Sequence, residues 1–420
     1  MVFNIYVFYP VINLKPLSVK FSFYLILFFS SLALRAAVYT EPESMRFNFS
    51  TELIEEDTLK SAGEDTITFR DKLDRFNDFM EKFIIYSPLP VISYSTETNW
   101  LFGLTKINAF RMGTKNQNDT TIQPSHITAL GYYTLNKQYK FAVTVNLMFG
   151  NNKYESFTQI LYINFPDLYF GVGNDNDINK RCVVLTRNLS IEQMMGYKFA
   201  KNWYVGIKYD YNNYFKVDTI QFEEVPCNEE VPDLTVNEGT QSGIGFRIDR
   251  ETRDNRFNAK RGSFLFFEYQ NFGKWIGSKF NYNSIIIEYR KYVTPLKWLT
   301  IAGQVYSEFK LGDVPVQSLA LMGGDNRMRG IYIGMFRDHT MIESQVELRF
   351  PIYWIFSGVF FTGLGEVGST LKSYTWDGIK WTYGAGLRLS VNEATRTNIR
   401  FDIGFYKVKP LFFFTFSEAF

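Results

Sequence analysis

The residues of this sequence best suited to hold charge in a confined space are an arginine in a glycine-rich loop and a glutamate that follows it. Arg329 lies in a loop before a series of alternating segments, and Glu347 lies on the polar face of the first of them. The glycines and the aromatic residue of this loop are Gly323, Gly324, Gly330 and Tyr332. An arginine in a partly dehydrated space is costly unless a carboxylate accepts its hydrogen bonds, and a bidentate pair also fixes its orientation. The sequence therefore predicts a loop held by a buried ion pair, with a solvated Arg329 that contacts nothing as the alternative.

Residue types that support catalysis are sparse in this chain. The two histidines, His126 and His339, are far apart, and neither is followed by a serine or cysteine arrangement that would form a nucleophile and its base. The run 171–177 offers oxygen ligands for calcium but lacks the ligand at the twelfth position of a calcium loop, which favours a polar turn. No phosphate-binding glycine loop is present. We therefore expect no enzyme, no metal site and no cofactor.

The aromatic content indicates a class of protein. Aromatic residues make up 18% of the 420 residues, with 42 Phe and 27 Tyr, which is far more than soluble domains need. A membrane β-barrel uses such residues in two aromatic girdles beside its lipid-facing band, while every second side chain faces a polar lumen. The mean hydropathy of -0.15 fits this mixture. The formal net charge of +2, without a basic cluster, argues against nucleic acid and leaves outer-membrane lipid as the expected surroundings.

From about residue 91 the hydrophobic pattern has a period of two, which indicates strands with two unlike faces. In the segment 203–212 apolar side chains alternate with mostly polar ones, and the segments 340–351 and 397–406 repeat this pattern. A soluble sandwich would alternate as well, but the strand lengths and aromatic ends favour a barrel. The predicted fold class is all-β: a transmembrane antiparallel β-barrel of about 16 strands with a short N-terminal helical segment.

The expected strands define the connections. Separate strands are expected at 156–165 and 167–175, a tight periplasmic turn at 294–296, and long outer loops at 216–239 and 310–339. This register places His126 and His339 in or beside outer loops.

The two cysteines, Cys182 and Cys227, both fall in outer loops on this register. They are too few for a disulfide scaffold, but an exported protein meets an oxidising compartment. A disulfide between them is a hypothesis, and two unrelated thiols are the alternative.

The first 87 residues are expected to precede the barrel domain in the sequence. Residues 1–37 are predicted to be a signal peptide, because Lys15 and Lys20 precede an apolar run and small residues follow it. The apolar run of about 14 residues is too short to span a bilayer as a helix. Residues 38–87 are predicted to be an acidic leader with an amphipathic helix at 66–84, and this segment is expected to plug the barrel mouth, lie on its periplasmic face or serve as a tether. The barrel is expected at 88–420.

The stretch from about residue 88 to 420 resembles the bacterial surface antigen family, the BamA/TamA-type outer-membrane assembly barrels. The resemblance is carried by an Arg-Asp-Asn turn with a closing glycine at 248–262, the loop 328–332, the strand 347–351, and the segments 384–388 and 399–402. It implies that acids on the next strands hold the loop arginine inside the barrel, and that one of them corresponds to Glu347. Gly363 stands where the family has the second acid, and Glu366 lies on the opposite face. The ion pair that holds the loop inside the barrel, here called the latch, is therefore expected to depend on Glu347.

The last expected strand, 411–420, carries several phenylalanines on one face. They are Phe412, Phe414, Phe416 and Phe420. A terminal aromatic residue on such a strand resembles the signal by which assembly machinery recognises barrel substrates, with Phe416 and Phe420 as its residues. A lipid-facing strand without a signal is the alternative.

The resemblance implies a compact barrel that helps to fold, insert or translocate other proteins at the bacterial outer membrane. Its implied partners are unfolded outer-membrane proteins and a separate periplasmic protein, because residues 40–86 are too few to form the POTRA modules that the family usually carries. A passive channel or transporter gated by the inward-folded arginine loop is the main alternative, and a structural or adhesive surface barrel is another.

Overall fold

The computed structural model describes residues 88–420 apart from 96–98, 114–124, 136–137, 178–180, 221–233, 257, 354–355, 393–395, 408 and 417. The expected signal peptide, acidic leader and helix at 66–84 all lie outside the described residues.

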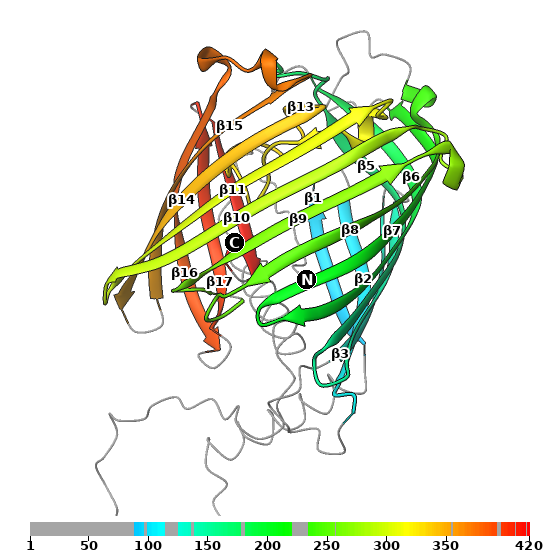
Figure 1. Ribbon diagram of the computed structural model, residues 1–420. Coiled ribbons are helices and arrows are strands. Elements are labelled where there is room, and N and C mark those ends of the chain that lie inside the picture. The colour runs from blue at the N-terminus through cyan, green and yellow to red at the C-terminus, as the bar shows by residue number, and fades with distance from the viewer. Residues whose placement is uncertain are drawn as a thin grey trace, which may run out of the picture.

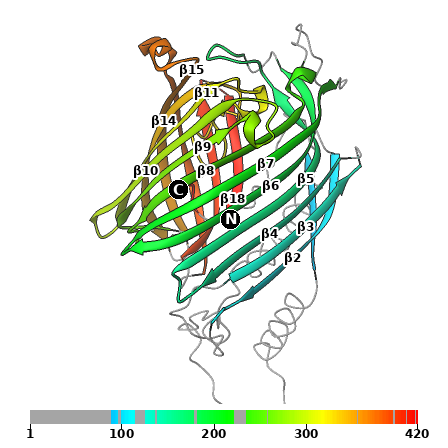
Figure 2. The ribbon, with the colours of Figure 1, turned by 45° about the vertical axis from the view of Figure 1, so that its right-hand side comes forward.

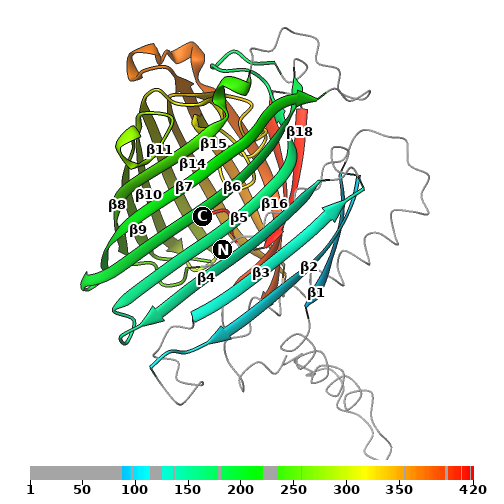
Figure 3. The ribbon, with the colours of Figure 1, turned by 90° about the vertical axis from the view of Figure 1, so that its right-hand side faces the viewer.

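The chain forms one antiparallel sheet of 16 strands whose spatial order follows the sequence (Figure 1). The strands are strongly tilted and together surround a lumen (Figure 2). Their bounds are β1 (Leu89–Ser95), β2 (Asn99–Phe110), β3 (Ser125–Thr134), β4 (Tyr139–Phe149), β5 (Tyr154–Tyr169), β6 (Cys182–Ala200), β7 (Trp203–Ile220), β8 (Gly239–Glu251), β9 (Gly262–Phe272), β10 (Tyr282–Leu296), β11 (Leu299–Gly312), β14 (Thr340–Tyr353), β15 (Phe356–Gly368), β16 (Lys380–Asn392), β17 (Thr397–Tyr406) and β18 (Lys409–Phe416). The predicted barrel class is confirmed. The edge strands β1 and β18 lie on the same side of the molecule (Figure 3).

Short helices and a second small sheet lie in the connections. A two-stranded sheet joins β12 (Ala320–Leu321) and β13 (Arg337–Asp338). The 3-10 helices are η1 (Leu234–Asn237), η2 (Lys274–Ile276), η3 (Val316–Ser318), η4 (Leu371–Ser373) and η5 (Trp376–Gly378). Across the described ranges, no helix has both the length and the apolar character needed to cross a bilayer.

The strand count was right although two strands were misassigned, because one strand was expected as two and another was not expected. The expected strands at 156–165 and 167–175 are one strand, β5, in which Pro166 pairs with Leu185. Strand β1, which contains Pro90, was not expected at all. Proline is tolerated at a sheet edge, and β1 is an edge strand. The expected turn at 294–296 is also wrong, because β10 continues to Leu296 and the chain turns at 297–298.

Because the single strand β5 was expected as two strands, every strand before it was expected to run in the direction opposite to the observed one. One end of the barrel has the tight turns 201–202 and 297–298, whereas the other has the longer connections 170–181 and 313–339. Short turns are typical of the periplasmic end and long loops of the outer end. His126 lies near the start of β3, at the short-turn end, so its expected place in an outer loop is wrong.

The two faces of the strands are arranged as a membrane barrel requires. On β14 the apolar side chains of Val346 and Leu348 are 43% and 40% exposed, while the acids Glu343 and Glu347 are buried. A soluble sandwich buries its apolar face instead. The exposed face of β14 is therefore the lipid face, and its polar face is covered inside the barrel.

The long connection 313–339 folds back into the lumen. Its apolar residues join side chains of β5, β6, β14 and β15 in one buried cluster. The loop members of this cluster are Ala320, Met322, Met328, Ile331, Met335 and Phe336. The loop therefore shares a hydrophobic core with the barrel wall.

Candidate functional site

The tip of the inward loop is a closed turn. The backbone N–H of Gly324 donates to the carbonyl of Ile331 at 3.0 Å, and the N–H of Ile331 donates to the carbonyl of Met328 at 3.1 Å. Met328 has a φ of 43°, which is uncommon for a residue with a side chain. This turn directs the next residue, Arg329, toward β17.

The loop backbone lies directly against β17 because both surfaces carry glycine at the contact. A Cβ atom on Gly330 would lie 2.6 Å from the carbonyl carbon of Phe405. A Cβ atom on Gly404 would lie 2.6 Å from the carbonyl carbon of Arg329. Gly330 also has a φ of 115°, a conformation that favours glycine. The close approach therefore requires glycine on both sides.

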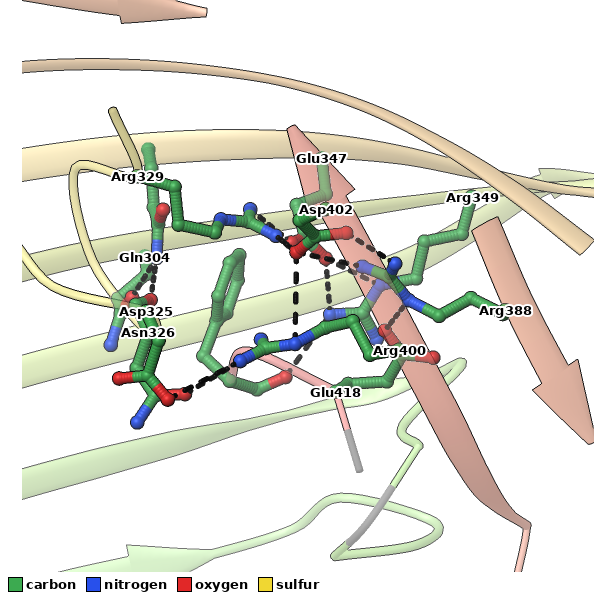
Figure 4. A network of polar contacts seen from close by, with 12 residues as sticks. Gln304, Asp325, Asn326, Arg329, Glu347, Arg349, Arg388, Arg400, Asp402 and Glu418 are labelled. Atoms are coloured by element: carbon green, nitrogen blue, oxygen red, sulfur yellow. Dashed lines mark hydrogen bonds and ion pairs between the residues drawn. The ribbon is translucent and has the colours of Figure 1, made fainter. Parts of the chain in front are cut away.

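Arg329 is fully buried between two carboxylates that come from different strands (Figure 4). Its Nη1 donates to Oδ2 of Asp402 on β17 at 2.6 Å, and its Nη2 donates to Oε1 of Glu347 on β14. The guanidinium carbon lies 3.7 Å from the ring centroid of Phe361 on β15. Charge-assisted hydrogen bonds and a cation–π contact thus fix the arginine in three directions.

The two carboxylates are themselves held by further arginines. Nε of Arg349 donates to Oε2 of Glu347 at 2.7 Å, and Nη1 of Arg388 donates to Oδ1 of Asp402 at 2.5 Å. Nε of Arg400 lies 3.6 Å from Oδ2 of Asp402. These charges are almost completely buried, and buried ions are stable only when they are paired and hydrogen-bonded.

Neighbouring residues attach the rest of the loop tip to the wall. Arg327 pairs with Glu343, and its guanidinium carbon lies 3.8 Å from the ring centroid of Tyr306. The amide of Gln345 donates to the backbone carbonyl of Asn326 at 2.6 Å. The loop is therefore anchored at several points beside Arg329.

The C-terminal tail enters the lumen from the short-turn end. Strand β18 ends at Phe416, and Glu418, Ala419 and Phe420 are buried. Nε of Arg388 donates to Oε2 of Glu418 at 2.8 Å, so the tail joins the same ionic network as the loop.

Comparison with protein families identifies this architecture. A model described as the Omp85 superfamily domain matches residues 113–417. The chain belongs to the Omp85 superfamily. Members of this superfamily are outer-membrane β-barrels rather than enzymes, and this Omp85 barrel is a protein of the bacterial outer membrane.

Solved structures resemble the Omp85 barrel in fold at low sequence identity. The barrel is similar to BamA from Haemophilus ducreyi lacking POTRA domains 1-3, with 11% identity, a TM-score of 0.50, and coverage of 83% of this chain and 77% of that one. CdiB from Escherichia coli matches with 9% identity and a TM-score of 0.49, covering 82% and 70%. CdiB from Acinetobacter baumannii matches with 10% identity and a TM-score of 0.47, covering 78% and 57%. No curated protein matches the sequence.

The Omp85 barrel brings together only some of the residues that were predicted to form the latch. Arg329 and Glu347 are in direct contact, and Gly330 makes the close approach to β17. Gly323 and Gly324 lie at the base of the loop turn, with positive φ angles of 98° and 113°. The hydroxyl of Tyr332, in contrast, donates to Oδ1 of Asp167 on β5 at 3.0 Å.

Sequence reasoning missed the second acid of the latch. Asp402 on β17 occupies that role, whereas the family resemblance implied an acid at the position of Gly363 on β15. Asp402 lies on the polar face of an alternating strand, as Glu347 does, which is the signal that could have indicated it. Glu366, considered as a substitute, instead accepts a hydrogen bond from the backbone N–H of Thr375 at 3.0 Å.

The C-terminal phenylalanines do not share one lipid face as expected. Phe412 is 54% exposed, but Phe420 is 5% exposed and lies beyond the strand, which ends at Phe416 rather than at residue 420. The chain reverses into the lumen before Phe420, so this residue packs against β10 instead of lipid. The assembly-signal role of Phe416 and Phe420 stays a prediction.

The remaining candidates lie at the outer end. Cys182 begins β6, is buried and is disulfide-bonded, whereas Cys227 lies outside the described residues, so their pairing stays a prediction. The run 171–177 connects to two other loops. The Asn176 amide donates to the carbonyl of Met335 in the inward loop at 2.8 Å, and the Asn174 amide donates to that of Gly378 between β15 and β16 at 2.8 Å.

Proposed function

We propose that this Omp85 barrel assembles, inserts or translocates other proteins at the outer membrane. The observation that carries the proposal is the inward loop held by Arg329 between Glu347 and Asp402. A loop fixed by buried charges and a hydrophobic cluster occupies the lumen in which an open pore would lie. An interior occupied by this loop leaves the sheet edge as the surface on which another chain can act.

The sheet edges support this function. Within the described part of the chain, β1 pairs with β2 alone and β18 with β17 alone. An edge strand carries unpaired backbone donors and acceptors, and these can accept an added strand from another polypeptide. Unfolded outer-membrane proteins, with their alternating strands, have the chemistry that fits such an edge. A separate periplasmic partner would deliver them.

The alternative function, a passive channel gated by the loop, is disfavoured by the same packing. Opening such a channel would separate Arg329 from two carboxylates and expose the apolar residues of the loop. Breaking a buried ion pair typically costs about 3–5 kcal/mol. If the barrel were a channel, the full-length protein would conduct in planar bilayers. We expect the full-length protein to show low conductance instead.

Depletion of the protein followed by quantitative proteomics of the outer membrane tests the proposal. We expect other barrel proteins to decrease in the membrane and unfolded forms to accumulate. Wild-type protein should restore them, and Arg329→Ala should not. Asp218→Asn is the matched control, because Asp218 pairs with Lys216 at a site where both side chains are more than 40% exposed. Unchanged outer-membrane composition on depletion would reject the proposed function.

A further inference from the structure

We infer that the lumen contains a peptide-binding site for a segment with a carboxylate two residues before an aromatic ring, and that the chain's own tail, Glu418–Phe420, is its tethered occupant. This inference goes beyond the proposed function and does not depend on it, because the site is defined by contacts within the barrel alone.

The carboxylate end of the site is formed by β16 and β17. Oε2 of Glu418 accepts a hydrogen bond from Nε of Arg388 at 2.8 Å, and Oε1 accepts one from Nδ2 of Asn398 at 2.7 Å. The Glu418 side chain is 2% exposed and that of Arg388 is 1% exposed. Each carboxylate oxygen therefore has its own donor in a region closed to solvent. Such a site distinguishes an acid from an amide, since an amide cannot accept both bonds.

The aromatic end of the site is formed by β10 and β14. The ring centroid of Phe420 lies 6.2 Å from that of Tyr292 on β10, and the guanidinium carbon of Arg349 lies 5.4 Å from the Phe420 ring centroid. Ala259 and Ala302 complete this buried cluster. Nη2 of Arg349 also donates to the backbone oxygen of Phe420 at 3.1 Å. The site therefore contacts both the ring and the backbone of the residue that it binds.

The charges around the tail require an anion. Four buried arginines lie in this network, and they face four acids, one of which is Glu418 on the tail. The arginines are Arg329, Arg349, Arg388 and Arg400, and the other acids are Asp325, Glu347 and Asp402. Without the tail the network would have an excess of positive charge. An uncompensated buried charge is unstable, so an empty site would favour another carboxylate.

The tail can leave this site without disrupting the sheet. The pairing of β17 with β18 ends at Ile399 and Phe416, and residues 418–420 lie outside the ladder. A tethered occupant acts at an effective concentration in the millimolar range when its linker is short. An added peptide therefore competes poorly with the native tail. Removal of the tail should strengthen the binding of that peptide on the order of 100-fold.

Titration of purified barrel in detergent with a fluorescein-labelled peptide of residues 416–420 tests the inference. The protein forms are wild type and a variant that lacks residues 418–420. We expect the truncated variant to bind the peptide on the order of 100-fold more tightly than wild type. A peptide with Gln in place of Glu should bind the truncated variant at least about 10-fold more weakly, since its amide leaves a buried donor unpaired.

Two outcomes would overturn the inference. One is a folded truncated variant that binds the peptide no better than wild type, with folding verified by the gel shift between boiled and unboiled samples. The other is equal binding of the acid and amide peptides. If the truncated variant does not fold, the full-length double variant Glu418→Gln/Phe420→Ala takes its place in the same titration, with the same expected and contrary results.

Discussion

Arg329 and Asp402 lie 73 residues apart in the sequence and are joined inside the barrel by a hydrogen bond of 2.6 Å, with both side chains fully buried. Met328 explains why the acid comes from β17 rather than from β15. A Cβ atom on Gly363 of β15 would lie 2.9 Å from the Met328 sulfur. The loop fills the space above Gly363, so a carboxylate cannot be placed there without moving it. β17 supplies the acid from the other side of the guanidinium.

The first prediction concerns the pairing of Arg329 with Asp402. We expect Asp402→Ala to destabilise the barrel by about 3–5 kcal/mol, because three buried arginines lose a common ion-pair partner. A double-mutant cycle with Arg329→Ala should give a coupling energy of about 0.5–3 kcal/mol, since each change removes the same contact. Urea unfolding in detergent measures both quantities, with the gel shift between boiled and unboiled samples as the readout of folded protein.

An exposed ion pair provides the control for this cycle. Lys216 and Asp218 are 3.2 Å apart, with 41% and 43% of their side chains exposed. Asp218→Asn should change the unfolding free energy by no more than about 1 kcal/mol. Additive effects of Arg329→Ala and Asp402→Ala would contradict the pairing.

The sequence predicted the barrel and the buried arginine because both leave local signals. Period-two alternation marks each strand, and Glu347 lies on a polar strand face. The approach of Gly404 to the loop leaves no such signal, since it depends on how far the loop enters the lumen. The reversal of the chain before Phe420 was also hidden, because the phenylalanine pattern continues past the end of β18. Contacts between distant segments thus decided the parts of the site that were missed.

A second prediction tests the close approach between loop and wall. Gly404→Ala would place a methyl group 2.6 Å from the carbonyl carbon and oxygen of Arg329, so the loop must move away. We expect a loss of about 1–3 kcal/mol. Brief trypsin treatment of the folded barrel should cleave at Arg327 or Arg329 in this variant and spare the wild type.

Gly303→Ala is the matched control for Gly404→Ala. A Cβ atom on Gly303 of β11 meets nothing within 4 Å. This variant should keep wild-type stability and resistance to trypsin. If both glycine variants behave alike, the loop does not lie against β17 as described.

The third prediction concerns pH and a contact between two periplasmic turns. Nη1 of Arg396, between β16 and β17, donates to Oδ2 of Asp254, between β8 and β9, at 2.5 Å. Partial burial disfavours the charged form, but hydrogen bonds from Arg396 and from the backbone N–H groups of Arg261 and Lys260 outweigh it and lower the pKa of Asp254. The contact therefore stabilises the barrel above the unfolded pKa of about 3.9, and this stabilisation is lost as pH falls through the lower folded value.

Unfolding of wild type and Asp254→Asn between neutral and acidic pH measures this contribution. We expect a difference below about 1 kcal/mol at neutral pH, since the pair is partly exposed, and almost none once Asp254 is protonated. Arg396→Gln should reduce stability at neutral pH by a similar amount. A difference that grows as pH falls would show that Asp254 is not stabilised as a carboxylate.

The last prediction concerns the outer end of the barrel, where Cys182 is disulfide-bonded at the start of β6. We predict that its partner is Cys227, the second of the two cysteines in the sequence. Such a bond limits the freedom of the unfolded chain and typically contributes about 2–4 kcal/mol. Intact mass measured under denaturing conditions with and without reductant should differ by two hydrogens, and Cys227→Ser should leave Cys182 reactive toward a thiol reagent after denaturation. Two thiols that react in the denatured wild-type protein without reductant would contradict the pairing. A lower unfolding free energy of the barrel after reduction would show that the bond stabilises the outer loops.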